Sequence, residues 1–432
     1  MCWRSGWDRL LCAGWVEMRD ILFLAHRIPY PPDKGDKIRA WNILQHLAGR
    51  YRVHLGTFVD APEDVCHIDH LRTICTSVFW RRLSPRVAAL RGLRSLVSGA
   101  SLTQGYFGDS GFGSEVERTI IRHRPSLIYI FSSAMAPYVA QQRAIRVILD
   151  MVDVDSEKWR QYAETAVWPA RVIYSREGRA LLALERRAAA NANAVIFVTS
   201  AEAKLFSSLA PETSDHVHSV RNGVDVDFFS PSLEFANLMD DRPAIVFTGV
   251  MDYRPNVDAM TWFVDQVMPR LREEPRPPCL WIVGSNPDRA VRALAGPDVR
   301  VTGRVPDIRP YLRHASVVVA PLRIARGVPN KVLEAMSMAA PVIVTPQIRV
   351  ALDGCKDDEL LTATTPVEFA DRVRYVLGGN AAHLGARARE RVVSDYRWDA
   401  SLVALDKLIE EAPTAPTAGE ATSYPSAFPI LA

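Results

Sequence analysis

The stretch Arg326-Gly-Val-Pro-Asn-Lys-Val-Leu-Glu-Ala-Met-Ser-Met-Ala-Ala-Pro-Val-Ile-Val344 decides how the second half of the chain folds. Its pattern predicts a loop, a helix, a short turn and a buried strand, in that order. A helix N-terminus offers free backbone N–H groups and a positive dipole end, which suit a phosphate. Lys331 falls in the first helical turn, and Glu334 follows one turn later on the same face, where a carboxylate can accept hydrogen bonds from a ribose diol. The stretch therefore predicts a nucleotide diphosphate site.

Short apolar runs alternate with helical patterns along almost the whole chain. The first set of runs covers residues 21–25, 53–59, 127–131, 147–151 and 194–198. After Asp240 a second set covers residues 244–248, 280–283, 299–302, 317–320 and 342–345. Strands as apolar as these are covered by helices on both faces, as in a parallel sheet. We therefore predict an α/β protein with two Rossmann-like, doubly wound domains.

The two sets of strands also suggest the domain boundaries. Asn222-Gly223 is typical of a tight turn, and Pro231 discourages helix just before the second set begins. The first strand begins directly after Met18-Arg19-Asp20, so the natural start is expected at Met18. The predicted parts are an extension before that start at 1–17, a first domain at 18–230, a second domain at 231–395, a helix at 396–411 that crosses back to the first domain, and a disordered tail at 412–432.

Composition excludes several classes of protein. The net charge of +3 over 432 residues is too small to indicate nucleic acid as a bulk partner. The six cysteines form no C-x-x-C pair, which fits a reduced cytoplasm better than a disulfide framework. No apolar run reaches the roughly 18–20 residues that a membrane span needs. We therefore expect a cytoplasmic globular protein.

Five stretches, in this order, carry a resemblance to a known family. They are His26-Arg-Ile-Pro-Tyr-Pro-Pro-Asp-Lys-Gly-Asp-Lys-Ile-Arg39, Asp150-Met-Val-Asp-Val-Asp-Ser-Glu-Lys-Trp159, Asn222-Gly-Val-Asp225, Phe247-Thr-Gly-Val-Met-Asp-Tyr-Arg-Pro-Asn256 and the stretch from Gly327 to Val344. The chain resembles GT-B-fold glycosyltransferases of glycosyltransferase family 4, and within them the sugar transferases of exopolysaccharide and PEP-CTERM sorting systems.

The resemblance implies two domains facing a cleft, with the acceptor on the N-terminal domain and the nucleotide-sugar donor on the C-terminal domain. It also implies transfer with retention of anomeric configuration to a cell-surface polysaccharide or its lipid-linked precursor. It further implies that no metal is required. No cofactor is expected, because the nucleotide-sugar is a co-substrate.

One departure from the family pattern bears on activity. The family commonly has a Glu-x7-Glu pair in the donor site, and Glu334 matches the second Glu, whereas Arg326 stands at the first. Arg326 is expected to bind phosphate or a carboxylated sugar, or else to be an exposed structural arginine. The departure leaves two alternatives open: a catalytically silent GT-B protein that binds nucleotide-sugar or glycan, and a nucleotide-sugar epimerase.

Departure of a nucleotide diphosphate without a metal requires cations and backbone N–H groups. Gly249 follows the first strand of the second domain, where backbone can approach phosphates. Arg254 is a second cation candidate, with a surface charge ahead of Pro255 as the alternative. Arg304 is a candidate for contact with base or phosphate, with a plain turn as the alternative. The full predicted donor set is Gly249, Arg254, Arg304, Arg326, Gly327, Asn330, Lys331 and Glu334.

The first domain offers candidates for the acceptor side. Gly35, Asp36 and Lys37 open a helix after the first strand and are predicted to hold acceptor or phosphate, with Asp36 as a simple helix cap being the alternative. His26 ends that strand and is a candidate for contact with acceptor hydroxyls, or else a structural histidine. Asp153 is predicted to face the acceptor as a base.

Asp153 belongs to Asp150-x-x-Asp153-x-Asp155, which resembles a carboxylate cluster for a divalent ion. Acids that fall together in a loop by coincidence are the alternative to both a base and a metal site, with Ser156 as the cap of the next helix.

A basic stretch in the first domain predicts a further partner. Arg81, Arg82, Arg86, Arg91 and Arg94 are interleaved with Val87, Leu90, Leu93 and Leu96. Such a pattern can lie on an anionic membrane surface, which would place the protein at the inner face of the plasma membrane. The alternative, which we favour from sequence, is an amphipathic helix packed on its own domain.

Overall fold

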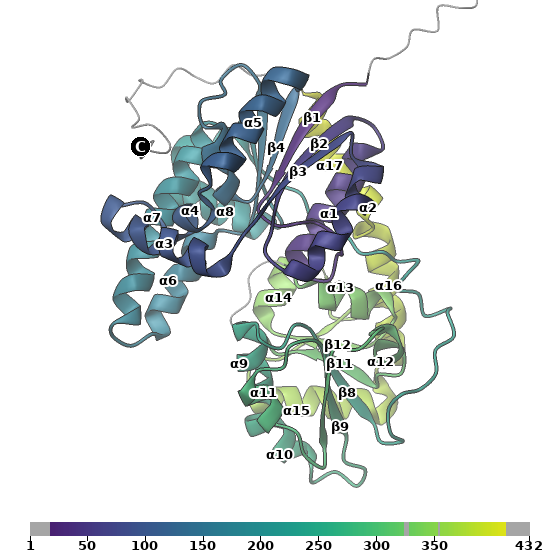
Figure 1. Ribbon diagram of the computed structural model, residues 1–432. Coiled ribbons are helices and arrows are strands. Elements are labelled where there is room, and N and C mark those ends of the chain that lie inside the picture. Colours follow the sequence, from purple (N-terminus) through teal and green to yellow (C-terminus); the bar gives the residue numbers. More distant parts are fainter. Residues whose placement is uncertain (1–17, 324–327, 353–354, 412–432) are drawn as a thin grey trace, which may run out of the picture.

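Two parallel β-sheets organise the structure, a computed structural model that describes residues 18–323, 328–352 and 355–411 (Figure 1). The predicted extension 1–17 and tail 412–432 lie outside these residues. In spatial order the first sheet contains β3 (Ser77–Arg82), β2 (Arg52–Val59), β1 (Asp20–Ala25), β4 (Leu127–Phe131), β5 (Arg146–Val152), β6 (Ala194–Phe197) and β7 (Val217–Ser219).

The second sheet repeats this order with later strands. It contains β10 (Val299–Gly303), β9 (Cys279–Val283), β8 (Ala244–Thr248), β11 (Val317–Ala320), β12 (Val342–Val344) and β13 (Leu361–Thr362). All neighbouring strands in both sheets run parallel. The order 3-2-1-4-5-6 is that of a doubly wound Rossmann-like sheet. The prediction of two such α/β domains is confirmed.

Helices cover both faces of the first sheet (Figure 1). Side chains of β1 alternate between two apolar cores, with Leu22 and Leu24 in one and Ile21 and Phe23 in the other. The helices of this domain are α1 (Gly35–Ala48), α2 (Ile68–Ile74), α3 (Pro85–Ser98), α4 (Leu102–Phe107), α5 (Ser110–His123), α6 (Asp155–Thr165), α7 (Ala170–Ala190) and α8 (Ser200–Leu209), with the 3₁₀ helices η1 (Pro62–His67), η2 (Ser133–Val139) and η3 (Pro211–His216).

The second domain is built around its own apolar core, which includes Phe247 of β8, Val319 of β11 and Leu333. Its helices are α9 (Arg254–Trp262), α10 (Met268–Leu271), α11 (Arg289–Ala293), α12 (Arg309–Arg313), α13 (Asn330–Ser337), α14 (Pro346–Ala351), α15 (Pro366–Tyr375) and α16 (Ala382–Asp395), with π-helical turns η4 (Phe263–Val267) and η5 (Val376–Asn380). None of the helices in the described part of the chain combines the length and the apolar character that crossing a membrane would need.

The structure corrects the sequence interpretation at one edge of the first sheet. Arg81 and Arg82, expected to open the basic amphipathic stretch, end strand β3, and α3 begins only at Pro85. β3 is an edge strand that pairs only with β2, and none of its residues is fully buried. It therefore lacks the continuous apolar run of a central strand.

The last helix of the described chain, α17 (Trp398–Glu410), lies on the first domain although it follows the second in sequence (Figure 1). Its side chains Leu402, Leu405 and Leu408 belong to the same apolar core as Leu44 of α1. His46 of α1 lies 2.6 Å from the carboxylate of Asp406. The chain therefore crosses between the domains twice.

The two crossings run side by side. Asn222-Gly223 does not form the expected tight turn; it is an extended connection that passes Trp398, and a Cβ at Gly223 would lie 2.6 Å from the Trp398 Cα. Val224 forms an isolated parallel bridge with Arg397, and its N–H donates to the Tyr396 carbonyl at 2.7 Å. Glycine is needed here because the two chains approach so closely.

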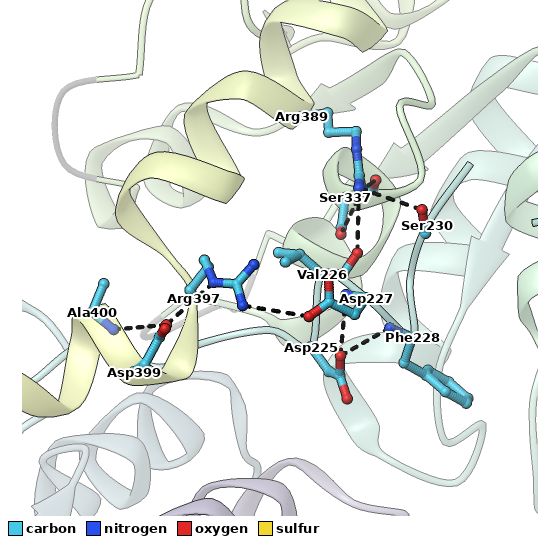
Figure 2. Close-up of polar contacts among 10 residues, drawn as sticks. All are labelled: Asp225, Val226, Asp227, Phe228, Ser230, Ser337, Arg389, Arg397, Asp399 and Ala400. Atoms are coloured by element: carbon cyan, nitrogen blue, oxygen red, sulfur yellow. Dashed lines mark hydrogen bonds and ion pairs between the residues drawn. The ribbon is translucent and has the colours of Figure 1, made fainter. Parts of the chain in front are cut away.

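Figure 2 shows the polar contacts that hold these crossings. Arg397 lies 3.4 Å from the Asp227 carboxylate, and Arg389 of α16 donates to the Val226 carbonyl at 3.3 Å and to the Ser337 carbonyl at the end of α13. The Asp225 carboxylate accepts two backbone N–H groups of the turn that follows it. Residues 222–227, which we call the linker, are thus attached to the second domain by side chains as well as by the chain itself.

Candidate functional site

The carboxyl ends of β8 and β9 form a close-packed edge in the second domain. Gly249, directly after β8, has φ +152°, and its N–H donates to the Val283 carbonyl at 3.0 Å. Gly284, directly after β9, has φ +154°, and a Cβ there would lie 1.6 Å from the Gly249 carbonyl oxygen. Both positions require glycine, so the backbone at this edge is open to a ligand.

Lys331 of α13 reaches this edge. Its Nζ lies over the Phe247 ring, 3.9 Å from the centroid, and donates to Asn256 Oδ1 at 2.8 Å. Asn256 is in turn fixed by donating from Nδ2 to the Val250 carbonyl at 2.8 Å. A Cβ on Gly249 would lie 2.7 Å from Lys331 Nζ. The sequence-predicted residues Gly249 and Lys331 are therefore in direct proximity.

Glu334 stands one turn further along α13. Burial raises the pKa of its carboxyl to about 7, and the nearby Lys331 ammonium opposes this shift. Burial also lowers the pKa of Lys331 to about 7, which Glu334 opposes. Each side chain therefore lacks the solvation that its charge needs, and a ligand with complementary charge would supply it.

The other predicted donor residues that the structure describes, Asn330, Arg304 and Arg254, lie in separate places. Asn330 is the first residue of α13 and accepts a hydrogen bond from Asn222 Nδ2 at 3.2 Å, across the domain boundary. Arg304 follows β10 and is exposed. Arg326 and Gly327 lie outside the described residues.

Arg254 opens α9, yet its side chain turns toward the first domain. Its Nη2 donates to Thr165 Oγ1 of α6 at 3.1 Å, and its guanidinium lies 5.0 Å from the centroid of the Tyr162 ring. A phosphate contact would require this side chain to leave α6. This contact could not be predicted from the sequence, because Thr165 lies 89 positions from Arg254.

On the first domain, His26 follows β1 and lies between aromatic side chains. Its ring stacks on Phe131, with centroids 5.9 Å apart, and meets Phe107 edge-on at 5.6 Å. Its Nε2 is 3.6 Å from the Asp36 carboxylate of α1. Burial opposes ionisation of Asp36, but His26 and Arg27 outweigh it and hold the pKa of that carboxyl well below its ordinary value.

The residues at the start of α1 have different environments. Gly35 has open space where a Cβ would be. Lys37 is buried, and its ammonium is 2.7 Å from Asp64 and 3.6 Å from Asp33. The helix is not capped by Asp36, since Lys34 occupies the N-cap position. The Lys37 charge is therefore balanced within the protein.

Asp150 near the end of β5 and Asp153 and Asp155 beyond it are all paired with cations. Asp150 is fully buried and accepts from Arg39 Nε at 2.8 Å, while Asp153 and Asp155 each lie 2.9 Å from Lys158 Nζ. Ser156 does not cap α6; its N–H and hydroxyl both donate to Glu185 of α7. One oxygen of Asp153, Oδ1, is buried and has no hydrogen-bond partner among the described residues.

Several buried polar atoms near the two facing sheet edges also lack a hydrogen-bond partner within the described chain. They include His26 Nδ1 and Asp153 Oδ1 on the first domain, Thr248 Oγ1 and Asn330 Nδ2 on the second, and Arg39 Nη2 beside the linker. Buried polar groups are nearly always paired in native proteins. A polar ligand between the domains would supply partners for these atoms.

Arg39 connects the first domain to this region. It is buried, and its Nη1 donates to the Val220 carbonyl and to Asn222 Oδ1, each at 2.9 Å. Tyr129 donates to the same Asp150 oxygen that receives Arg39 Nε. Sequence reasoning missed Asn222 and Asn256 as site residues, although both lie within the stretches that carried the resemblance.

Comparison with known proteins agrees with this architecture. Residues 242–378 match a family model described as glycosyl transferases group 1. Curated protein sequences yield no match. The chain is similar in structure to sucrose-phosphate synthase from Thermosynechococcus elongatus, with a TM-score of 0.67 and 18% identity over 90% of this chain and 98% of that one.

Two further solved structures align over almost their whole length. WaaG, a glycosyltransferase involved in lipopolysaccharide biosynthesis, has a TM-score of 0.63 and 15% identity, covering 90% of this chain and 100% of that one. Anabaena Alr3699/HepE in complex with UDP has a TM-score of 0.63 and 13% identity, covering 91% and 99%. The chain therefore has the GT-B fold, and this fold together with the group 1 region supports a glycosyltransferase.

Proposed function

We propose that the protein transfers a sugar from a nucleotide-sugar to a cell-surface polysaccharide or its lipid-linked precursor, with retention of configuration and without a metal. The observation that carries the proposal is the placement of Lys331 beside Gly249, with Glu334 interacting with Lys331 from one turn further along α13. A cation, a carboxylate and the N-terminus of α13 meet at the carboxyl edge of a Rossmann-like sheet, where such folds bind nucleotides.

The donor would lie on the second domain with its diphosphate at Lys331, Gly249 and the first turn of α13. Lys331 would stabilise the departing diphosphate, and Glu334 would accept hydrogen bonds from the ribose diol. Asn330, Arg304, Arg326 and Gly327 are proposed to complete the donor site, and Arg254 joins it if the donor displaces its contact with α6.

The acceptor would lie on the first domain, beside His26 and Asp153. Each has a buried polar atom without a partner among the described residues, and each follows a strand end that faces the second domain. Gly35 and Asp36 are proposed to border this acceptor site, with Lys37 fixing the local charge. In a retaining reaction the leaving diphosphate itself can take the proton of the incoming hydroxyl, so Asp153 is proposed to orient the acceptor or act as a base.

A thermal-shift screen against nucleoside diphosphates and nucleotide-sugars tests the donor site. A ligand at about 100 times its Kd should stabilise the folded protein by ~2.7 kcal/mol. Glu334→Ala should weaken the shift, whereas Glu273→Ala, at an exposed position of the same domain, should leave it unchanged. Absence of a shift with every nucleotide would refute the donor site.

Product analysis then separates the three activities. Release of free sugar or its transfer to an acceptor excludes a silent binding protein. An altered sugar that stays attached to the nucleotide would identify an epimerase instead.

A further inference from the structure

Helix α3 exposes three large apolar side chains. Val87, Leu90 and Leu93 are 52%, 62% and 56% exposed, and their spacing places them on one side of the helix. Ala88 and Gly92, on the opposite side, are small and buried. The helix thus packs on its own domain, as favoured from sequence, but not through Val87, Leu90 and Leu93.

The packing of α3 on α4 explains this orientation. A Cβ at Gly92 would lie 3.3 Å from the Leu102 carbonyl oxygen, and a Cβ at Gly105 of α4 would lie 3.0 Å from the Gly92 Cα. Two glycines therefore bring the helices into backbone contact. A larger side chain would not fit at either glycine, and Leu90 and Leu93 face solvent instead.

The connection between α6 and α7 is a second exposed apolar element. Val167 and Trp168 are each 81% exposed, and Val172 and Ile173 in the first turn of α7 are 59% and 41% exposed. Figure 1 shows the paired helices α6 and α7 projecting from the first domain. A tryptophan exposed to this degree at the tip of a projecting pair is costly in water.

The two elements belong to one side of the domain. Arg176 of α7 donates to the carbonyls of Ser95 and Ala100 at the end of α3, at 2.9 and 3.1 Å. Glu177 accepts the N–H groups of Leu102 and Thr103 at the start of α4. These contacts hold α3 beside the first turns of α7.

The charge of both elements is of one sign. Residues 85–98 contain three arginines and residues 166–176 contain two, and neither segment contains an acid. Arg86, Arg94 and Arg171 are exposed. Arginines beside apolar side chains, with a tryptophan at the tip, match the interface of an anionic bilayer, where arginines meet lipid headgroups and tryptophan prefers the boundary.

We propose that α3 and the α6–α7 connection form a docking surface for an anionic lipid bilayer. The proposal rests on the proposed function, because a lipid-linked acceptor would lie in that bilayer. Thr165, at the end of α6, contacts Arg254 of the donor-binding domain and is three residues from Trp168. Docking would therefore hold the lipid surface next to the junction of the two domains.

Flotation with vesicles tests the surface independently of catalysis. The full chain is mixed with vesicles of phosphatidylcholine with or without phosphatidylglycerol, at low and at high salt. Binding is expected only to vesicles that contain phosphatidylglycerol and is expected to weaken with salt. Leu90→Glu/Trp168→Glu should lower the partition coefficient at least ~10-fold, and loss of Arg86 or Arg94 should lower it roughly fivefold each.

Ile121→Glu is the matched control, since Ile121 is 75% exposed on α5 and outside the surface. It should bind vesicles like the unmodified chain, and all variants should keep the same thermal unfolding and nucleotide-induced shift. The proposal is overturned if the unmodified chain ignores phosphatidylglycerol vesicles, or if Leu90→Glu/Trp168→Glu binds them equally well. It is also overturned if light scattering shows a dimer that this variant dissociates without any change in vesicle binding. A normal nucleotide shift with no vesicle binding would refute only the bilayer surface.

Discussion

Lys331 is predicted to make donor binding weaken as the pH rises above neutrality. Burial lowers the pKa of its ammonium from 10.5 to about 7 in the protein without ligand. A diphosphate placed against Nζ would favour the charged form and raise that pKa again. Donor binding therefore takes up a proton once the free protein has lost it.

The size of the effect follows from the fraction of protonated Lys331. With a pKa of about 7, the charged form falls from one half at pH 7 to ~3% at pH 8.5. If only the charged form binds the diphosphate, Kd should rise roughly fifteenfold over that interval, or ~1.6 kcal/mol. The diphosphate of a nucleotide-sugar has no proton to lose in this range, so the slope belongs to the protein.

Isothermal titration calorimetry with UDP-glucose, or with the nucleotide-sugar that the thermal-shift screen selects, measures this slope directly. Titrations in buffers of different ionisation enthalpy should show proton uptake near pH 8. Lys331→Arg is expected to bind more weakly at pH 7 but to lose the weakening of binding with rising pH, because a guanidinium stays charged. A constant Kd for the unmodified chain, or an equal slope in Lys331→Arg, would refute the reasoning.

Three further predictions concern residues around the site and in the domain core. Asn256→Ala should weaken donor binding roughly tenfold in calorimetry, because it releases Lys331 from the hydrogen bond that positions it, and should cost ~1–3 kcal/mol in urea unfolding, because Lys331 and the Val250 carbonyl each lose a partner. Arg39→Met leaves Asp150 buried without its ion pair and should cost ~3–5 kcal/mol in urea unfolding, whereas Arg39→Met/Asp150→Leu should cost much less. Burial raises the pKa of Glu185 from 4.5 to about 8, so the folded protein keeps a proton that the unfolded chain loses. The free energy of unfolding should therefore fall as the pH rises between these values. Glu185→Gln should flatten that fall in unfolding experiments at pH 5 and 8.

Strands buried on both faces could be predicted from the sequence because burial imposes a continuous apolar run. This holds for β1, β4, β5, β8 and β11, whose bounds agree with the predicted runs to within one residue or two. β3 is a partly exposed edge strand, and β7 and β13 have three and two residues. Strands that are partly exposed carry too little apolar pattern to be recognised from sequence.

The candidate site also contains residues that could be predicted from the sequence and residues that could not. Lys331 and Glu334 could be proposed from sequence, because helical spacing alone puts them on one face of α13. The residues that contact α13 could not be predicted in this way, because Asn256 is 75 positions from Lys331 and Asn222 is 108 positions from Asn330. Arg254 shows the limit most clearly, because its strand-end position suggested a phosphate while the fold brought Thr165 within hydrogen-bonding distance.

Helix α17 makes the order of synthesis matter for this protein. The first domain leaves the ribosome early, but Leu402, Leu405 and Leu408, which complete its core against α1, are made only after the whole second domain. Until then Leu44 and its neighbours on α1 lack their covering layer, and the nascent first domain carries an open apolar groove. Among the described residues, the core of the second domain contains no side chain of α17, so it does not wait for this helix. We therefore expect it to reach a stable fold first, and the domain that is translated first to be the last to mature.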